Sequence, residues 1–109
     1  MTGALATPPA VAVVWTRVGS DSARFAALLD TARMGRFRRA EDRASYAAAH
    51  GLLRLTLAGL TGLDARAFRI TGPAGTKPTV VAPAPAAAAG FDVSLTHTDG
   101  LAAIAIGRG

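Results

Sequence analysis

The segment FDVSLTHTDGLAAIAIGRG, residues 91–109, decides the fold that this sequence predicts. Residues 91–96 alternate between apolar and polar side chains, which is typical of a strand with one face on the core. Residues 101–107 are apolar again, and Asp99-Gly100 between the two runs is a strong signal for a hairpin turn. We therefore expect two antiparallel strands joined at a polar tip. The inward side chains are expected to be Phe91, Val93 and Leu95, and the outward ones Asp92, Ser94 and Thr96.

The N-terminal part predicts a strand followed by a helix. Residues 11–18 (VAVVWTRV) are rich in β-branched side chains and apolar on both alternating faces, so we expect a buried strand. Residues 1–9 are expected to be a flexible start. The turn at residues 19–22 supplies polar side chains that can cap a helix. The apolar stripe of that helix consists of Phe25, Leu28, Leu29 and Ala32.

A second helix is predicted over residues 41–60. Glu41 and Asp42 fall in its first turn, where carboxylates are favoured by the helix dipole, and Gly62 suits a C-terminal stop. The side chains expected on its buried face are Tyr46, Ala49, His50, Leu53, Leu57 and Leu60. His50 lies on this apolar stripe, and we interpret it as a packing residue rather than a ligand.

The region between this helix and the hairpin predicts one more short strand. Residues 67–71 alternate, residues 72–78 form a loop by their glycines and prolines, and residues 82–90 (APAPAAAAG) suggest a semi-extended Ala/Pro connector. The order strand, helix, helix, strand, hairpin predicts a single α+β domain over residues 1–109. We expect a small, mainly antiparallel sheet with two helices packed on one face.

Composition narrows the classes of function. Half of the residues are hydrophobic, which argues against disorder throughout the chain, and the absence of cysteine excludes disulfides and thiolate sites. The formal charge of +5 favours an anionic partner, such as a nucleic acid, a phosphorylated small molecule or an acidic protein. No targeting segment or membrane span is recognisable, so a cytoplasmic protein is expected.

The acidic residues do not predict a metal site. Aspartate and glutamate together number 7, and no two of them stand in a D-x-E or D-x-D pair. Glu41 and Asp42 are adjacent on a helix and point about 100° apart, so they suit a helix N-terminus better than a common ligand. A triad of Ser94 and His97 with an aspartate is rejected, because the two residues fall on opposite faces of one strand.

Basic residues give three weak signals for anion binding. Lys77, the only lysine, is held between glycine and proline in a loop, where it is either a solubilising charge or a phosphate ligand. His97 at the hairpin tip is either a surface turn residue or a phosphate contact. An arginine cluster is either a solvated face or an anion pocket, and its members are Arg33, Arg36, Arg38, Arg39 and Arg43.

Taken in order, these signals resemble a known family. Residues 36–64 (RFRRAEDRASYAAAHGLLRLTLAGLTGLD), then 75–78 (GTKP) and 94–107 (SLTHTDGLAAIAIG) are similar to the longer class of 4′-phosphopantetheinyl transferases. That family modifies carrier proteins of polyketide, nonribosomal-peptide and fatty-acid synthesis. Its members are pseudo-dimers of two similar α+β halves with coenzyme A between them. This chain resembles the N-terminal half.

The resemblance implies six residues that bind coenzyme A. The basic residues that hold its 3′-phosphate in the family fall near Arg33 and Arg36. The lysine of the family's G-K-P element matches Lys77, although Thr76 is inserted before it. The family's Ser-His pair, which holds phosphates, matches Thr96-His97 with the hydroxyl kept. A polar contact of some relatives falls at Tyr46.

The resemblance also implies what these residues lack. The G-x-D-x-E and W-x-x-K-E elements, whose acids bind magnesium in the family, are not found in this sequence. No residue is therefore assigned as catalytic or as a metal ligand. Transfer to an acyl or peptidyl carrier protein would need a complementary C-terminal half with the magnesium site. A split-enzyme subunit, a truncated product and a fragment all fit this pattern.

Two other functions stay open from the sequence. One is a non-catalytic module that binds an acidic carrier protein. The other, less favoured, is a small nucleic-acid binder using the arginine cluster, although few aromatic side chains are interleaved there to stack on bases. An exposed apolar surface is expected in the half-enzyme case, where it would favour a partner half or self-association.

Overall fold

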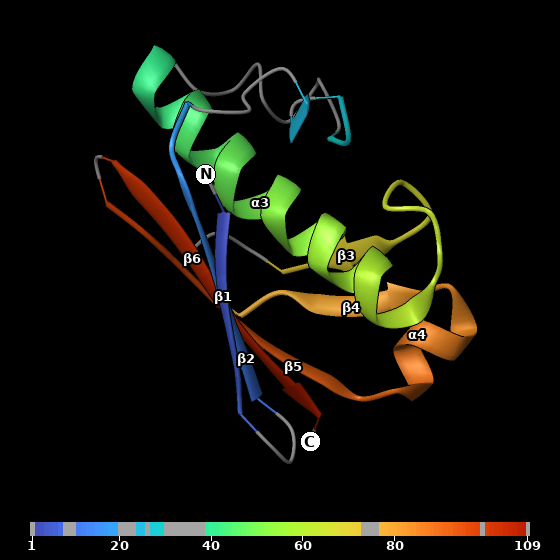
Figure 1. Ribbon diagram of the computed structural model, residues 1–109. Helices are drawn as coiled ribbons and strands as arrows, with labels where there is room; N and C mark the ends of the chain where they lie inside the picture. Colours follow the sequence, from blue (N-terminus) through green and yellow to red (C-terminus); the bar gives the residue numbers. More distant parts are fainter. Residues whose placement is uncertain are drawn as a thin grey trace.

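Four antiparallel strands form a sheet along one side of the molecule (Figure 1). The computed structural model describes residues 2–7, 11–19, 24–25, 27–29, 39–72, 77–98 and 100–108. The order of the strands across this sheet is β1 (Thr2–Thr7), β2 (Val11–Arg17), β6 (Leu101–Arg108) and β5 (Phe91–His97). β1 and β5 are therefore its edges, and the predicted hairpin of the last two strands is confirmed.

The pairing register divides the side chains of the sheet between two faces. Val93 lies opposite Ile106 and Leu95 opposite Ile104, and directly paired residues share a face. Val14 pairs with Ile104 from the other side, so the same face continues into β2. Val93, Ile104 and Ile106 are buried, and Val14 and Leu95 pack partly buried against them. This apolar face requires a cover, which the long helix supplies.

The helix α3 (Ala40–Thr61) lies across this face of the sheet (Figure 1). Glu41 and Asp42 stand in its first turn, as expected for carboxylates near a helix N-terminus. It ends at Gly62, whose φ of 76° is left-handed and whose N–H donates to the Ala58 carbonyl oxygen at 2.8 Å. The predicted second helix and its glycine stop are confirmed.

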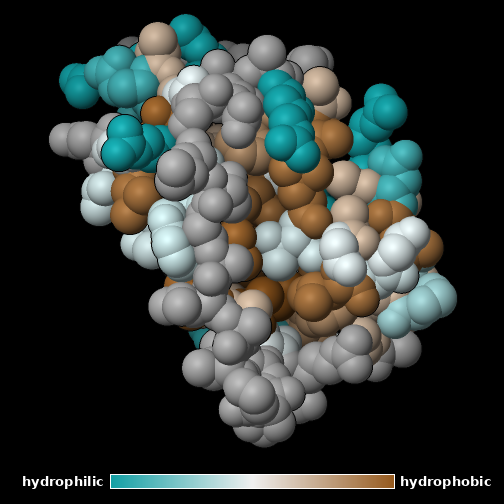
Figure 2. All heavy atoms as spheres, in the orientation of Figure 1, coloured by the Kyte–Doolittle hydropathy of each residue, from teal (hydrophilic) through white to brown (hydrophobic). Residues whose placement is uncertain are grey.

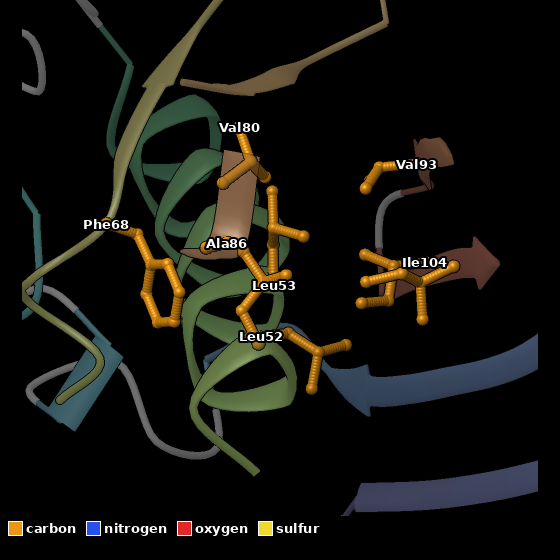
Figure 3. Packing of buried hydrophobic residues seen from close by; sticks show 9 residues of the cluster. Leu52, Leu53, Phe68, Val80, Ala86, Val93 and Ile104 are labelled. Atoms are coloured by element: carbon orange, nitrogen blue, oxygen red, sulfur yellow. The ribbon is translucent and has the colours of Figure 1, made fainter. Parts of the chain in front are cut away.

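The main core lies between α3, the sheet and the segment that follows the helix. Figure 3 shows Leu52 and Leu53 of α3 between Phe68 on one side and Val93 and Ile104 of the sheet on the other. The buried members of this core are Leu52, Leu53, Leu57, Phe68, Val80, Ala86, Val93, Ile104 and Ile106. The sequence placed Leu53 and Leu57 on this buried face. Leu60, also expected there, is 49% exposed, because the last turn of α3 extends beyond the core.

A second cluster packs around the N-terminal half of α3. Its buried members are Phe25, Ala47, Ala48, Ala49 and Ala102. Of the predicted first helix, the structure describes residues 24–25, which are helical, and residues 27–29, which form a turn and a bend instead of the predicted helix. The burial of Phe25 and the partial burial of Leu28 and Leu29 agree with its predicted stripe, and Ala32 lies outside the described residues.

A small second sheet differs from the prediction for residues 67–90. β3 (Arg69–Thr71) is shorter than the predicted strand and pairs with an unpredicted strand, β4 (Thr79–Ala82). The expected semi-extended connector over residues 82–90 is wrong, because helix α4 (Ala84–Ala88) occupies most of it. Proline is tolerated in the first turn of a helix, and Ala86 is buried in the main core. The packing of Ala86 in the core thus favours a helix, although the low-complexity sequence predicted a connector.

The N-terminal residues also differ from the prediction. Residues 1–9 were expected to be a flexible start, but Thr2–Thr7 form β1, which pairs with β2 over its whole length. A strand next to an existing partner gains backbone hydrogen bonds that its own alternation does not reveal. Val13 of β2 was expected to be buried and is 38% exposed, because it lies on the sheet face away from α3.

The described residues form a compact α+β domain with two helices, one of them long, and small antiparallel sheets. The expected α+β class is confirmed. Of the two helices expected on one face of the sheet, α3 lies there, and the other falls mostly outside the described residues. The helix α4, which was not expected, packs on β4. The opposite face of that sheet carries no other described helix or strand (Figure 1). In Figure 2, apolar side chains gather over α3 and β4. The large apolar residues left exposed among those described are Val13, Leu60, Val81 and Leu101.

Candidate functional site

The edge strand β5 carries or contacts most of the described candidate residues. Thr96 and His97 stand at its C-terminal end and are exposed. Lys77, in the segment between β3 and β4, reaches its N-terminal end, where the Lys77 Nζ lies 3.3 Å from the Asp92 Oδ1. The candidate residues therefore lie at the two ends of β5 and do not meet at one point.

The Lys77–Asp92 ion pair is open to solvent. The two side chains are 64% and 65% exposed, so water screens the pair strongly. An exposed pair of this kind contributes about 0–1 kcal/mol to stability. The ammonium of Lys77 is therefore available to an incoming anion at small cost, and it is held in the meantime by Asp92.

The side chains of Thr96 and His97 lie on opposite faces of the sheet. His97 pairs with the buried Ala102 and so lies on the face that α3 covers, while Thr96 pairs with Ala103 on the other face. The same alternation places Ser94 on the face opposite His97, as predicted, and the pairing of β5 with β6 shows no break in register. The rejected triad therefore finds no support in the backbone geometry.

The ends of β5 are too far apart for one phosphate to contact both. Asp92 and His97 are five residues apart on an extended strand, which separates their Cα atoms by about 17 Å. While Lys77 is paired with Asp92, its ammonium and the imidazole of His97 do not converge. A ligand that contacts both must be long, or Lys77 must leave Asp92 and swing on its flexible stem.

Tyr46 stacks on His50 within α3. The ring centroids are 4.2 Å apart and the planes differ by 26°, as the i, i+4 spacing on a helix allows. Both side chains are half-buried, and His50 packs against Tyr46. A ligand contact by Tyr46 stays a prediction, and its ring already has this intramolecular neighbour.

Arg54 continues the row of Tyr46 and His50 by one more turn and has a structural role. Its Nη1 donates to the carbonyl oxygens of Ala65 at 3.1 Å and Phe68 at 2.7 Å. Burial lowers the pKa of the Arg54 guanidinium from its ordinary value, and nearby Tyr46 opposes this shift. Arg54 thereby fastens the segment after α3 to the helix, a function that no sequence signal indicated.

The predicted 3′-phosphate residues Arg33 and Arg36 lie outside the described residues. Arg38, of the same predicted cluster, also lies outside them. Of the remaining members, Arg39 is exposed just before α3 and Arg43 is half-buried in its first turns. The arginine cluster is thus present in the structure only in part, and its role stays a prediction.

Acidic and histidine side chains do not assemble within the described part of the chain. No three of them lie together there in a way that could hold a metal ion. Asp21, Asp30 and Asp99 fall outside the described ranges. As for membranes, none of the helices described is both long and apolar enough to span one.

Among the described residues, the imidazole of His97 and the hydroxyl of Thr96 stand exposed on β5, and the ammonium of Lys77 stands exposed beside it. The sequence did not indicate the pairing of Lys77 with Asp92, because residues fifteen apart with a loop, a strand and a helix between them carry no local signal.

The chain matches no known protein-family profile and no curated protein.

Proposed function

We propose that this chain is the coenzyme A-binding N-terminal half of a 4′-phosphopantetheinyl transferase, folded as one half of a pseudo-dimer. The order of the segments 36–64, 75–78 and 94–107 along the chain supports this proposal. The position of the segment 94–107 in the hairpin of β5 and β6 also supports it. The observation that carries the proposal is the exposed Thr96-His97 pair at the end of an edge strand. Solvent-facing donors there can bind phosphate without unfolding any part of the core.

In this proposal the chain grips the phosphates, and a complementary half completes the reaction. The serine Oγ of the carrier protein attacks the phosphorus that bears pantetheine, and the bond from that phosphorus to the 3′,5′-ADP leaving group breaks. The serine proton passes to a base in the complementary half. Magnesium, when bound there, would neutralise charge on the pyrophosphate. Lys77, His97, Arg33 and Arg36 would supply the remaining positive charge and donors from this side.

The surface for the complementary half would be the face of the larger sheet opposite α3, on which no other described helix or strand lies. Val13 and Leu101 are 38% and 42% exposed, and the register places both on this face. Apolar side chains on an open sheet face favour contact with a partner. The partner would be the complementary half or, in its absence, a second copy of the chain. An acyl or peptidyl carrier protein in the cytoplasm is the expected acceptor.

Ligand titration tests the binding step. Calorimetry with coenzyme A, dephospho-coenzyme A and pantetheine separates the contribution of the 3′-phosphate from that of the pyrophosphate and adenosine together. We expect the order of affinity to follow the number of phosphate groups. Equal affinity for all three ligands, or no binding of any, would contradict the proposal. Duplex DNA at two salt concentrations is the comparison, since salt-sensitive DNA binding without coenzyme A binding would favour a nucleic-acid binder.

A carrier-protein mass-shift assay tests the transfer step. Coenzyme A and magnesium are supplied with this chain alone and then with a complementary half that carries the G-x-D-x-E and W-x-x-K-E elements. We expect modification of the carrier only in the second case. Modification by this chain alone would show that it holds its own catalytic groups. Carrier binding without coenzyme A binding would favour the non-catalytic interaction module.

A further inference from the structure

Asp92 pairs with the only lysine of the chain and is not among the residues proposed to bind coenzyme A. Its Oδ1 lies 3.3 Å from the Lys77 Nζ, and this ion pair ties the segment between β3 and β4 to the start of β5. Asp92 stands opposite Gly107 and belongs to neither buried cluster. Its carboxylate can therefore change partners without disturbing the core.

A carboxylate in this position opposes phosphate binding in two ways. It occupies the ammonium that a phosphate would use, and its own charge repels a second anion. Both side chains of the pair are about two-thirds exposed, so the pair is weak enough for a doubly charged phosphate group to displace it. The geometry adds a third effect, because pairing with Asp92 holds the ammonium at the end of β5 opposite to His97.

We propose that Asp92 is an internal competitor for Lys77 that sets the affinity and the salt dependence of phosphate binding. In the free chain Lys77 is held by Asp92, and a phosphate group of the ligand takes the place of the carboxylate. Lys77 is then free to turn toward the rest of the ligand. This inference rests on the proposed function for two points, the contact of Lys77 with a phosphate group and the identity of the ligand as coenzyme A.

The test uses the fact that Lys77 is the sole lysine. Protein labelled with ¹³C-lysine gives a single side-chain NMR signal, which is followed during titration with inorganic pyrophosphate and, separately, with coenzyme A. The variant is Asp92→Asn, which keeps the shape and removes the charge. The matched control is Asp64→Asn, which removes the charge of another exposed ion pair, Arg66–Asp64, whose side chains are 71% and 68% exposed.

We expect Asp92→Asn to bind pyrophosphate about threefold more tightly than the unmodified chain at low ionic strength, with the difference shrinking in high salt. Asp64→Asn should shift the affinity much less, because its charge does not contact Lys77. The inference would be overturned if Asp92→Asn bound pyrophosphate no more tightly than the unmodified chain, or if both variants gained affinity equally. It would also be overturned if the Lys77 signal did not shift on addition of pyrophosphate in any of the three proteins.

The outcomes also separate this inference from the proposed function. If coenzyme A binds and the carrier is modified with a complementary half, but Asp92→Asn changes nothing, the competitor role fails and the proposed function stands. If Asp92→Asn tightens pyrophosphate binding while coenzyme A binds no better than pyrophosphate and supports no transfer, the proposed function fails and the competitor role stands.

Discussion

Gly51 and Phe25 are in direct contact across the second cluster of the core. A Cβ at position 51 would lie 2.5 Å from the Phe25 Cβ and 2.6 Å from its Cδ1, closer than carbon atoms approach. Phe25 is 1% exposed and belongs to a packed cluster, so its ring has little room to yield. The glycine inside α3 is therefore a packing requirement.

Gly51→Ala is expected to destabilise the protein. Alanine is the better helix former by about 1 kcal/mol, but overpacking against Phe25 costs about 1–3 kcal/mol, so the net change is a loss. Urea denaturation followed by circular dichroism measures it. Gly59→Ala in the same helix is the control, because nothing lies within 4 Å of its added Cβ. That substitution should stabilise by about 0.5–1 kcal/mol, and the same sign in both variants would contradict the packing role of Gly51.

Leu57 and Leu60 provide a second comparison within α3. Leu57 is 0% exposed in the main core, whereas Leu60 is 49% exposed on the final turn. Leu57→Ala should therefore lower the free energy of unfolding by about 3–5 kcal/mol, and Leu60→Ala by about 0.5 kcal/mol or less. Thermal unfolding of both variants checks this. A similar loss in the two would mean that the helix extends its contacts past Leu57.

Arg54 should be sensitive to substitution although it is a charged residue. Arg54→Met keeps much of the apolar stem but leaves the carbonyl oxygens of Ala65 and Phe68 without their donor. The expected loss is about 1–3 kcal/mol, the cost of leaving such acceptors unsatisfied. Arg66→Met, on an exposed side chain, is the control and should change stability by about 0.5 kcal/mol at most. Faster hydrogen exchange at residues 65–69 would locate the effect.

The sequence predicted an element correctly where the contacts that determine that element are local in the chain. The hairpin of β5 and β6, the strand β2 and the helix α3 follow from local periodicity and end signals, such as Asp99-Gly100 and Gly62. These features are local, because a turn or a helix stop acts on its immediate neighbours. They were predicted to within a few residues.

The elements that the sequence did not predict depend on distant partners. β1 has few strand-forming residues of its own and is defined by β2, and β4 is defined by β3. The helix α4 arises in a proline- and alanine-rich segment because Ala86 reaches the core. The same limit applies to the candidate site, where the partner of Lys77 is set by the path of the whole chain. Tertiary packing decides all four cases.

The last prediction concerns the two sides of β5 at the proposed phosphate site. His97 lies on the face that α3 covers and Ser94 on the opposite face, three residues away on the same strand. If phosphate is bound by the exposed imidazole, His97→Ala should weaken coenzyme A binding about tenfold, the equivalent of one hydrogen bond to a charged group. Calorimetry on folded protein measures this change.

Ser94→Ala serves as the control for His97→Ala, because it removes a polar group of β5 from the other face while leaving the pairing with β6 intact. We expect its affinity for coenzyme A to equal that of the unmodified chain. Both variants should also unfold at the same temperature as the unmodified chain, since both side chains are exposed. Equal loss of binding in the two would mean that the ligand follows the edge of the sheet without regard to face, and unchanged binding in His97→Ala would remove the imidazole from the site.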